Sequence, residues 1–596
     1  MSKQSTGKSK SRARKADPES VEITFDLYEL PTAQHKAGLA GLLMQIESMK
    51  NRGLDTPDYE WDAEFSATKV KVKFTKETSK SLFDDLYDAT LAEGPVREKP
   101  FTKGKGSDKK IVEPLRRQNF TKVDKKGKEK TVEGYVYEEL APSLNTLNHY
   151  LPEKGEWVKL WRDLIWQIIR EGQKKAPYIL RASQKKELNS AAETEHSDSD
   201  ATTKKETSRG DGSTWNDLLK IAKKGASATG KLSGALLLGA MEKNAESIVQ
   251  AGRVDQNLLL HFWPLAVMVF VPQFVDSDGK THIGRRSKKD SAPHYCIAVP
   301  EVADLRRFIE ECPRMYQQLN TQVAAFRPRE SLIDIPAQSA LAFITHLATL
   351  APGKVADSDV RRCVSAIDYF HLVKEGNNVK FLARGRVLPR TDLVEDYQDV
   401  VGRSGEKRPY ENPLFRSGLM SAILAGQPWY EPFARLFQEW PAEFFVRSED
   451  SPKHLSWFWI DARKKFDWET QMADEPDAPT DARLMKVIYR VVQSYVLNKA
   501  SSKSNVNLDK FRGDDGKLDW KRIPSDFAKE RSRVGESLFL ELRSRRDQAF
   551  VDHFTISLFA GKQYLSEADC ELLGVALFDR TDEVKTLTLM ALSANS

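Results

Sequence analysis

The strongest constraint on the fold is the apolar periodicity of the amino-terminal part of the chain. Residues 21–30, "VEITFDLYEL", and 67–77, "ATKVKVKFTKE", alternate apolar and polar residues as strands do. Between them, residues 33–53, "AQHKAGLAGLLMQIESMKNRG", have the spacing of a helix that ends near its last glycine. Gly38 and Gly41, together with neighbouring alanines, leave room for another backbone to approach this helix closely.

The pattern becomes mostly helical after Glu301. "VADLRRFIEEC", "SALAFITHLATLA" and "DVRRCVSAIDYFHLV" (359–373) have helical spacing. The sequence therefore predicts an α+β fold, with antiparallel strands and helices in a mixed amino-terminal domain and a mainly helical carboxyl-terminal half that ends in a helical bundle. A chain of 596 residues is too long for a single hydrophobic core, so we expect several domains. They are a basic tail (1–20), an α+β domain (21–330) with a mobile polar insertion (183–213), a mainly helical region (331–471) and a helical bundle (472–596).

Composition argues against several classes of protein. The four cysteines are far apart and form no Cys-x-x-Cys pair, and the ten histidines lack metal-ligand spacing. We expect no metal, no cofactor and no catalytic site. The first twenty residues have no apolar core, and the apolar stretch 258–271 is too short to cross a bilayer. A cytoplasmic protein without a membrane segment is expected.

Residues 223–246, "KKGASATGKLSGALLLGAMEKNAE", hold most of a phosphate-binding loop. Gly225, Gly230 and Lys231 fall in register, but Leu232 stands where a Ser or Thr should bind Mg²⁺. The preceding "STWNDLLKIA" looks helical, whereas a P-loop needs a strand there. We favour a chance match to the P-loop pattern, and a P-loop NTPase stays as the alternative.

Positive charge is concentrated in two segments. The net charge is +6, yet residues 1–16 alone carry +6, and residues 97–130 hold thirteen Lys/Arg against five Asp/Glu. Such focused charge is typical of polyanion binding, and a solvated linker is the alternative. The candidate nucleic-acid contacts in loops and turns are Lys103, Lys105, Lys109, Lys110, Arg116, Arg117, Lys231, Asn244, Gln256, Asn257, Arg285, Arg286, Lys288 and Lys289. For Asn244, a helix or turn cap is an equal alternative.

Two carboxyl-terminal helical patterns combine an apolar stripe with cations. In "ARLMKVIYRVVQSYVLNKA", basic side chains lie nearly opposite the stripe of Leu484, Ile488 and Val491. A later helix in "DFAKERSRVGESLFLELRSRRDQAFVDHF" repeats this combination. Solvent exposure alone is the alternative to phosphate binding. The candidate contacts are Arg483, Lys486, Arg490, Arg531, Arg533, Arg543, Arg545 and Arg546.

Five segments carry a resemblance to a known family. In order, they are "DLYELPTAQHKAGLAGLL" (26–43), "WVKLWRDLIWQIIR" (157–170), "LLLGAMEKNAE" (236–246), "NLLLHFWPLAVMVFVP" (257–272) and "YCIAVPEVADLRRF" (295–308). Together they resemble the large subunit of type I CRISPR surveillance (Cascade) complexes, closest to the subtype I-B kind. The resemblance covers roughly residues 21–310 and rests on sequence texture, not on a catalytic signature.

The resemblance implies a non-enzymatic function. Such subunits lie at the crRNA 5′ end, inspect the protospacer-adjacent motif in duplex DNA and promote strand opening and R-loop formation. The implied partners are crRNA, target double-stranded DNA, Cascade backbone subunits, a small subunit and a recruited helicase-nuclease, with no membrane. The carboxyl-terminal part can also be translated as a separate small subunit, for which Met472 is the expected internal start. A nucleic-acid-binding scaffold outside CRISPR is a further alternative.

Overall fold

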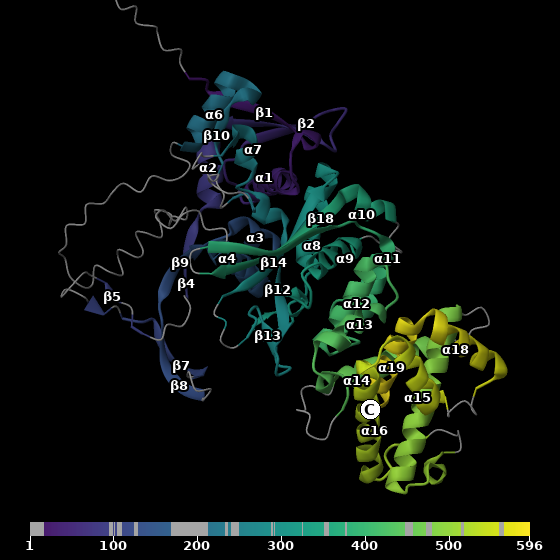
Figure 1. Cartoon of the computed structure of the whole chain (residues 1–596). Coiled ribbons are helices and arrows are strands. Elements are labelled where there is room, and N and C mark those ends of the chain that lie inside the picture. The colour runs from purple at the N-terminus through teal and green to yellow at the C-terminus, as the bar shows by residue number, and fades with distance from the viewer. Residues whose placement is uncertain are drawn as a thin grey trace, which may run out of the picture. The chain divides into compact units, whose positions relative to one another are not determined.

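In a computed structural model, shown in Figure 1, the chain forms two compact units. The first comprises Met1–Val269, Tyr295–Pro328 and His346–Pro389, and the second comprises Phe270–His294, Arg329–Thr345 and Arg390–Ser596. The expected tail up to residue 16 and the expected insertion up to residue 212 lie outside the described residues. The structure describes residues 17–93, 99–100, 102–103, 110–111, 113–123, 129–167, 213–232, 236–239, 250–287, 290, 292–324, 326–350, 357–375, 378–447, 457–472, 479–513, 518–559 and 565–596.

The amino-terminal strands of the first unit form a three-stranded antiparallel sheet. Its order is β1 (Ser20–Asp26), β3 (Lys69–Thr75) and β2 (Asp58–Trp61). Alternation along β3 places its apolar side chains in the core and its lysines on the other face. Acidic residues of both neighbouring strands lie opposite these lysines, and Lys71 contacts Glu22 at 2.8 Å. The charge on this face is therefore neutralised within the sheet.

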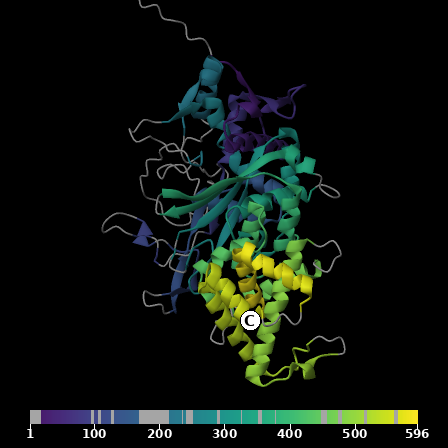
Figure 2. The ribbon, with the colours of Figure 1, turned by 45° about the vertical axis from the view of Figure 1, so that its right-hand side comes forward.

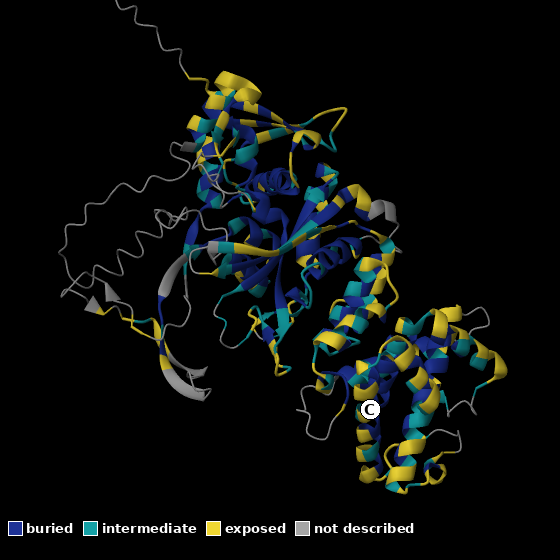
Figure 3. Ribbon diagram, viewed as in Figure 1, coloured by how far each residue is buried: buried dark blue, intermediate teal, exposed yellow. Residues whose placement is uncertain are grey.

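Helix α1 (Ala33–Asn51) is buried along nearly its whole length (Figure 3). Two glycines bring its backbone against another segment of the first unit. A Cβ atom on Gly38 would lie 2.3 Å from the carbonyl oxygen of Leu259, and one on Gly41 would lie 2.1 Å from that of Phe262. The close backbone approach predicted from these small residues is confirmed.

The other elements of the first unit are short, and five pairs of strands form separate two-stranded ladders: β4 with β9, β5 with β6, β7 with β8, β10 with β11 and β15 with β16. On α4, the predicted apolar side, including Trp157 and Trp161, is buried. The elements are α2 (Lys76–Leu86), β4 (Ala89–Glu93), β5 (Thr102–Lys103), β6 (Lys110–Ile111), β7 (Arg116–Val123), β8 (Glu129–Val136), β9 (Glu138–Pro142), α3 (Asn145–Tyr150), α4 (Gly155–Gln167), α6 (Ser213–Lys224), β10 (Thr229–Lys231), β11 (Ala251–Arg253), α7 (Val254–Leu259), α8 (Leu305–Gln318), β15 (Val323–Ala324) and β16 (Arg327–Pro328).

The helix predicted across residues 359–373 is wrong for most of its length. Helix α10 (Asp357–Cys363) ends early, and the chain continues as β18 (Val364–Glu375), which pairs antiparallel with β19 (Asn378–Val387). The β-branched and aromatic residues of β18 favour a pleated strand, and pairing with β19 decides between the two states. β14 (His294–Val302) lies on the other side of β18, so β19 is the last strand of this sheet.

The second unit combines a small part of a sheet with many helices (Figure 2). Most of β12 belongs to it and pairs with β13 and β17. In the predicted carboxyl-terminal bundle, α19 contacts α14, α15 and α16. The elements are β12 (Met268–Val275), β13 (Thr281–Ile283), β17 (Leu332–Ile333), α9 (Gln338–Ala348), α11 (Thr391–Val401), α12 (Pro413–Ala425), α13 (Glu431–Glu439), α14 (Trp457–Met472), α15 (Thr480–Ser504), α16 (Ser525–Ser544), α17 (Asp547–Ser557), α18 (Glu567–Asp579) and α19 (Thr581–Asn595).

A buried ion pair fixes α12 within this second unit. The Arg416 guanidinium contacts the Asp334 carboxylate with two hydrogen bonds of 2.7 and 2.8 Å, and both side chains are 3% exposed. Its remaining nitrogen donates to the carbonyl oxygens of Tyr410 and Glu411. The buried charges are thus paired and fully hydrogen-bonded, as low-dielectric surroundings require.

Candidate nucleic-acid interface

Asp276 organises the first half of the basic loop that follows β12. Its carboxylate accepts hydrogen bonds from the N–H groups of Asp278 and Lys280 at 3.0 and 2.9 Å, and it lies 2.6 Å from Nε2 of His282. Partial burial alone would raise the pKa of Asp276, but the hydrogen bonds from His282 and the backbone lower it overall. Gly279, at φ +77°, makes the turn between these donors.

Asp290 holds the second half of the same loop. It accepts hydrogen bonds from the N–H groups of Arg286 and Ala292 at 3.1 and 2.9 Å, and it lies 3.3 Å from Nε2 of His294. Here too desolvation is outweighed by hydrogen bonds, which lower the pKa of the carboxyl group. Sequence analysis missed both aspartates, although the Asp-x-Asp-Gly turn at residues 276–279 was a signal for the first.

Arg285 and Arg286 lie between β13 and β14, where Asp290 accepts a hydrogen bond from the N–H group of Arg286. Both residues are exposed, and neither guanidinium group has a hydrogen bond or an ion pair with any residue that the structure describes. The neighbouring candidates Lys288 and Lys289 lie outside the described residues. Two exposed guanidinium groups without a partner among the described residues suit contacts to phosphates or to guanine edges.

Lys231 is exposed on a hairpin and not in a P-loop. Gly230 and Lys231 belong to β10, which pairs with β11, and the elements before β10 are helix α6 and a short 3-10 helix, Gly225–Ser227. A P-loop would instead place both residues in a loop between a strand and a helix. Lys231 also lines a pocket of about 340 Å³, together with Lys220 and Asn257. The geometry therefore gives no support to the NTPase alternative.

Two candidate amides near this hairpin bond to the chain itself. Nδ2 of Asn257 donates to the carbonyl oxygen of Gly230 at 3.3 Å, and its Oδ1 lies 2.6 Å from where a Cβ on Gly252 would be. Gln256 donates to the carbonyl oxygen of Glu29 at 3.3 Å. Asn257 thus bonds to β10 and packs against Gly252 of β11. The candidate Asn244 lies outside the described residues.

The candidates of the charged segment 97–130 fall on short strands. Arg116 and Arg117 are exposed on β7, and Arg117 lies 3.7 Å from Glu133 and 5.7 Å from the ring of Tyr135 on the paired strand. The remaining candidates divide between strands and residues that are not described. Lys103 belongs to β5 and Lys110 to β6, while Lys105 and Lys109 lie outside the described residues.

The candidate residues on α15 differ in their exposure and in whether they have an ion-pair partner. Arg483 forms an ion pair with Asp569 at 2.9 Å, and Lys486 is half-buried. Arg490 is exposed and has no polar partner within the described ranges. The opposite stripe, with Ile488 at its centre, is buried as predicted.

The exposed position predicted for Arg531 on α16 is wrong. Arg531 is buried, donates to the carbonyl oxygen of Asn595 at 2.8 Å and lies 4.8 Å from the ring of Trp520. Burial, reinforced by the nearby charge of Arg463, lowers the pKa of Arg531 to about 9. The reason is helical geometry: Arg531 follows Phe527 by four residues, so it lies on the apolar stripe itself.

Two of the four other candidate arginines of this region, Arg533 and Arg543, have polar partners. Arg533 pairs with Glu530 at 2.8 Å, and Arg543 donates to the carbonyl oxygen of Trp440 at 2.7 Å. Arg545 is half-buried, and Arg546 is exposed at the start of α17. The basic face predicted for this helix is therefore smaller than the sequence indicated.

Neither a metal centre nor a reactive thiol stands out in the part of the chain that the structure describes. No group of three or more His, Cys, Asp or Glu side chains there could hold a metal ion. Burial raises the pKa of the Cys312 thiol to about 12, and it raises those of Cys296 and Cys363 as well, which disfavours the thiolate. None of the described helices is both long enough and apolar enough to cross a bilayer.

A mixed α+β unit and a mainly helical unit, with exposed arginines that have no ion-pair partner among the described residues, are compatible with a multidomain protein that binds polyanions. Two family models match the chain in order. The type I-B CRISPR Cas8b N-terminal domain matches residues 63–355, and the type I-B CRISPR Cas8b C-terminal domain matches residues 364–595. No match was found among curated proteins. The chain belongs to the type I-B CRISPR Cas8b family, whose members are Cascade large subunits, so the predicted resemblance is confirmed.

Proposed function

We propose that this large subunit binds near the crRNA 5′ handle, recognises the protospacer-adjacent motif in duplex DNA and promotes R-loop formation. It then presents the assembly, with its backbone and small subunits, to a helicase-nuclease. Family membership and one observation support this proposal: Arg285 and Arg286 stand free on a loop that Asp276 and Asp290 hold in place. A protein that leaves most sequence reading to RNA–DNA pairing needs only such a small contact set on the duplex.

The fixed loop also gives a physical reason for affinity. A loop that is ordered before binding loses less conformational entropy when it meets DNA than a loop that must first be ordered. Exposed guanidinium groups release counterions when they meet phosphates, and they can contact a guanine edge with two hydrogen bonds. Arg490 on α15 supplies a further free cation, which we propose lies along the hybrid or the displaced strand.

The test is purification of the full complex, followed by binding to labelled duplex target. The chain should co-purify with crRNA and backbone subunits. Arg285→Ala/Arg286→Ala should weaken duplex binding and reduce the salt slope by about 1.8, since each phosphate contact contributes about 0.9. The matched control is Lys69→Ala/Lys71→Ala, which removes the same charge from two side chains that are already paired with Asp26 and Glu22. A chain that never co-purifies with crRNA would contradict the proposal.

We also propose that the carboxyl-terminal part is made separately from an internal start at Met472. Met472 is the last residue of α14, so the product would lack that helix. In the full chain α14 stacks Phe466 on Tyr489 of α15, with ring centroids 4.7 Å apart. Met472→Leu should abolish a short carboxyl-terminal fragment on a blot, whereas Met485→Leu, inside α15, should leave it. An unchanged fragment in the first variant would contradict the start site.

A further inference from the structure

The β18–β19 hairpin presents aromatic and cationic side chains on one face of its sheet. The register pairs Arg386 with Asp368 and Arg384 with Phe370, so these four side chains share that face. Arg386 is neutralised, because its Nε lies 2.6 Å from Asp368. Arg384 is exposed, and no described residue is its hydrogen-bond or ion-pair partner.

A β-bulge opens the apolar part of this face to solvent. The register shifts between His371 and Leu372, which leaves Leu382 as an extra residue on β19. Phe381 and Leu382 are consecutive, yet they are 39% and 38% exposed. The Phe381 ring also contacts the partly exposed Phe370 edge-on, with centroids 6.2 Å apart.

The edge position of β19 raises the question of what this hairpin binds. A protein strand could in principle extend the sheet, but the bulge interrupts the ladder that a new strand would need, and the arginines blunt the edge. Ring faces beside a free cation are instead the elements of a platform for single-stranded nucleic acid. Among the described residues, the carboxylates of Asp368 and Glu301 on this face already contact Arg386, so neither is left as an unpaired charge beside Arg384.

We propose that this face binds single-stranded DNA, with a base stacked on the exposed Phe381 ring, which Phe370 supports edge-on, and a phosphate held by Arg384. The inference rests on the proposed function, since a strand is released only where duplex target is opened. It adds a binding surface that charge counting along the sequence does not reveal, because the hairpin carries acidic partners among its cations.

The test uses the full chain with fluorescein-labelled oligo(dT), oligo(rU) and an abasic strand of equal length. Phe381→Ala should weaken oligo(dT) binding by about 5- to 150-fold, the range measured for loss of one stacked base. It should leave binding to the abasic strand unchanged, because only the stack is lost. Phe381→Tyr should bind as the wild type does, and Arg384→Ala should reduce the salt slope by about 0.7.

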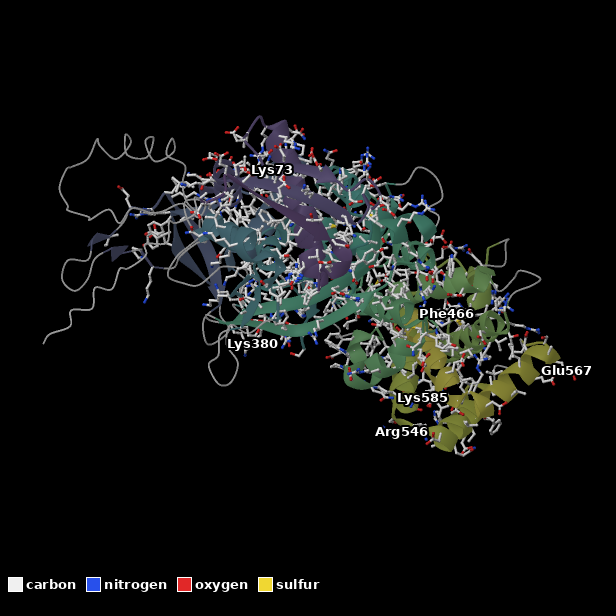
Figure 4. All side chains as sticks on the ribbon, turned by 90° about the horizontal axis from the view of Figure 1, so that it is seen from above. Lys73, Lys380, Phe466, Arg546, Glu567 and Lys585 are labelled. Carbon is white, nitrogen blue, oxygen red and sulfur yellow. The ribbon has the colours of Figure 1, made fainter. Side chains whose placement is uncertain are left out.

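Lys380→Ala is the matched control for charge. Lys380, marked in Figure 4, lies on the same strand but pairs with Val373, on the opposite face from Arg384, and its ammonium contacts Glu375. Equal losses in Lys380→Ala and Arg384→Ala would overturn the proposal, as would a Phe381→Ala variant that binds both strands equally weakly or binds oligo(dT) normally. Tighter binding of oligo(rU) than of oligo(dT) would overturn the assignment to DNA. If one of these overturning results occurs while Arg285 and Arg286 remain necessary for duplex binding, the proposal for the hairpin surface is wrong and the proposed function stands. A chain that also never assembles with crRNA overturns the proposed function itself.

Discussion

Gly41→Ala should destabilise the first unit, although the same substitution normally stabilises a helix. The new Cβ atom would lie 2.1 Å from the carbonyl oxygen of Phe262, whereas ordinary contacts begin at 3.4 Å. Helix α1 would therefore have to retreat by about 1.3 Å, because a backbone oxygen cannot rotate away as a side chain can. Overpacking of this kind costs about 3 kcal/mol, and helix propensity returns about 1 kcal/mol. The net loss should be about 2 kcal/mol.

Thermal unfolding and hydrogen exchange together can measure this loss where it arises. A loss of about 2 kcal/mol should lower the Tm of the first unit by about 4–8 °C. It should also speed amide exchange about 30-fold in peptides that cover α1 and residues 258–266. The control is Gly155→Ala at the start of α4, where no atom lies within 4 Å of the added carbon. If Gly41→Ala matches the wild type in both measurements, the close contact does not exist and the packing argument for α1 fails.

Three further substitutions test other parts of the physical account. Asp334→Ala should destabilise the second unit by about 3–5 kcal/mol in urea unfolding, because it leaves Arg416 buried without its partner. The double variant Asp334→Ala/Arg416→Met should recover most of that loss, because it also removes the buried charge. Burial lowers the pKa of His35 from 6.5 to about 4, so the unfolded chain binds the proton more readily than the folded chain. The free energy of unfolding should therefore fall by roughly 3 kcal/mol as the pH drops from about 6.5 towards 4. His35→Gln should remove this dependence, which is measured as Tm against pH. Gly574→Ala, inside α18 with open space around it, should raise stability by about 1 kcal/mol in the same unfolding assay.

The sequence was informative wherever a local pattern determines the structure. The small residues of α1 predicted a close backbone approach, and the apolar stripe of α4 predicted which side would be buried. Prediction from the sequence failed where pairing between distant residues decides the secondary structure. Residues 364–373 have apolar positions compatible with either a helix or a strand, and only the ladder with β19 selects the strand.

The candidate interface shows the same division between what is local and what is not. Every arginine counts as one positive charge in the sequence, so counting charges cannot tell Arg285, which has no partner among the described residues, from Arg483, which is paired with Asp569 far along the chain. Arg531 could have been assigned to the apolar stripe from its spacing to Phe527, but its bond to Asn595 could not.

Which cations remain unpaired therefore decides which surfaces can bind a polyanion. A cation that already has a carboxylate partner must give up that contact, or share it, before it can neutralise a phosphate, so it contributes less to binding and to its salt dependence. By this criterion we expect Lys69 and Lys71 of β3, which are paired with Asp26 and Glu22, to contribute less than Arg285, Arg286, Arg384 and Arg490. The net charge of +6 is thus a poor guide to the binding surfaces, because it does not distinguish paired cations from unpaired arginines such as Arg285, Arg384 and Arg490.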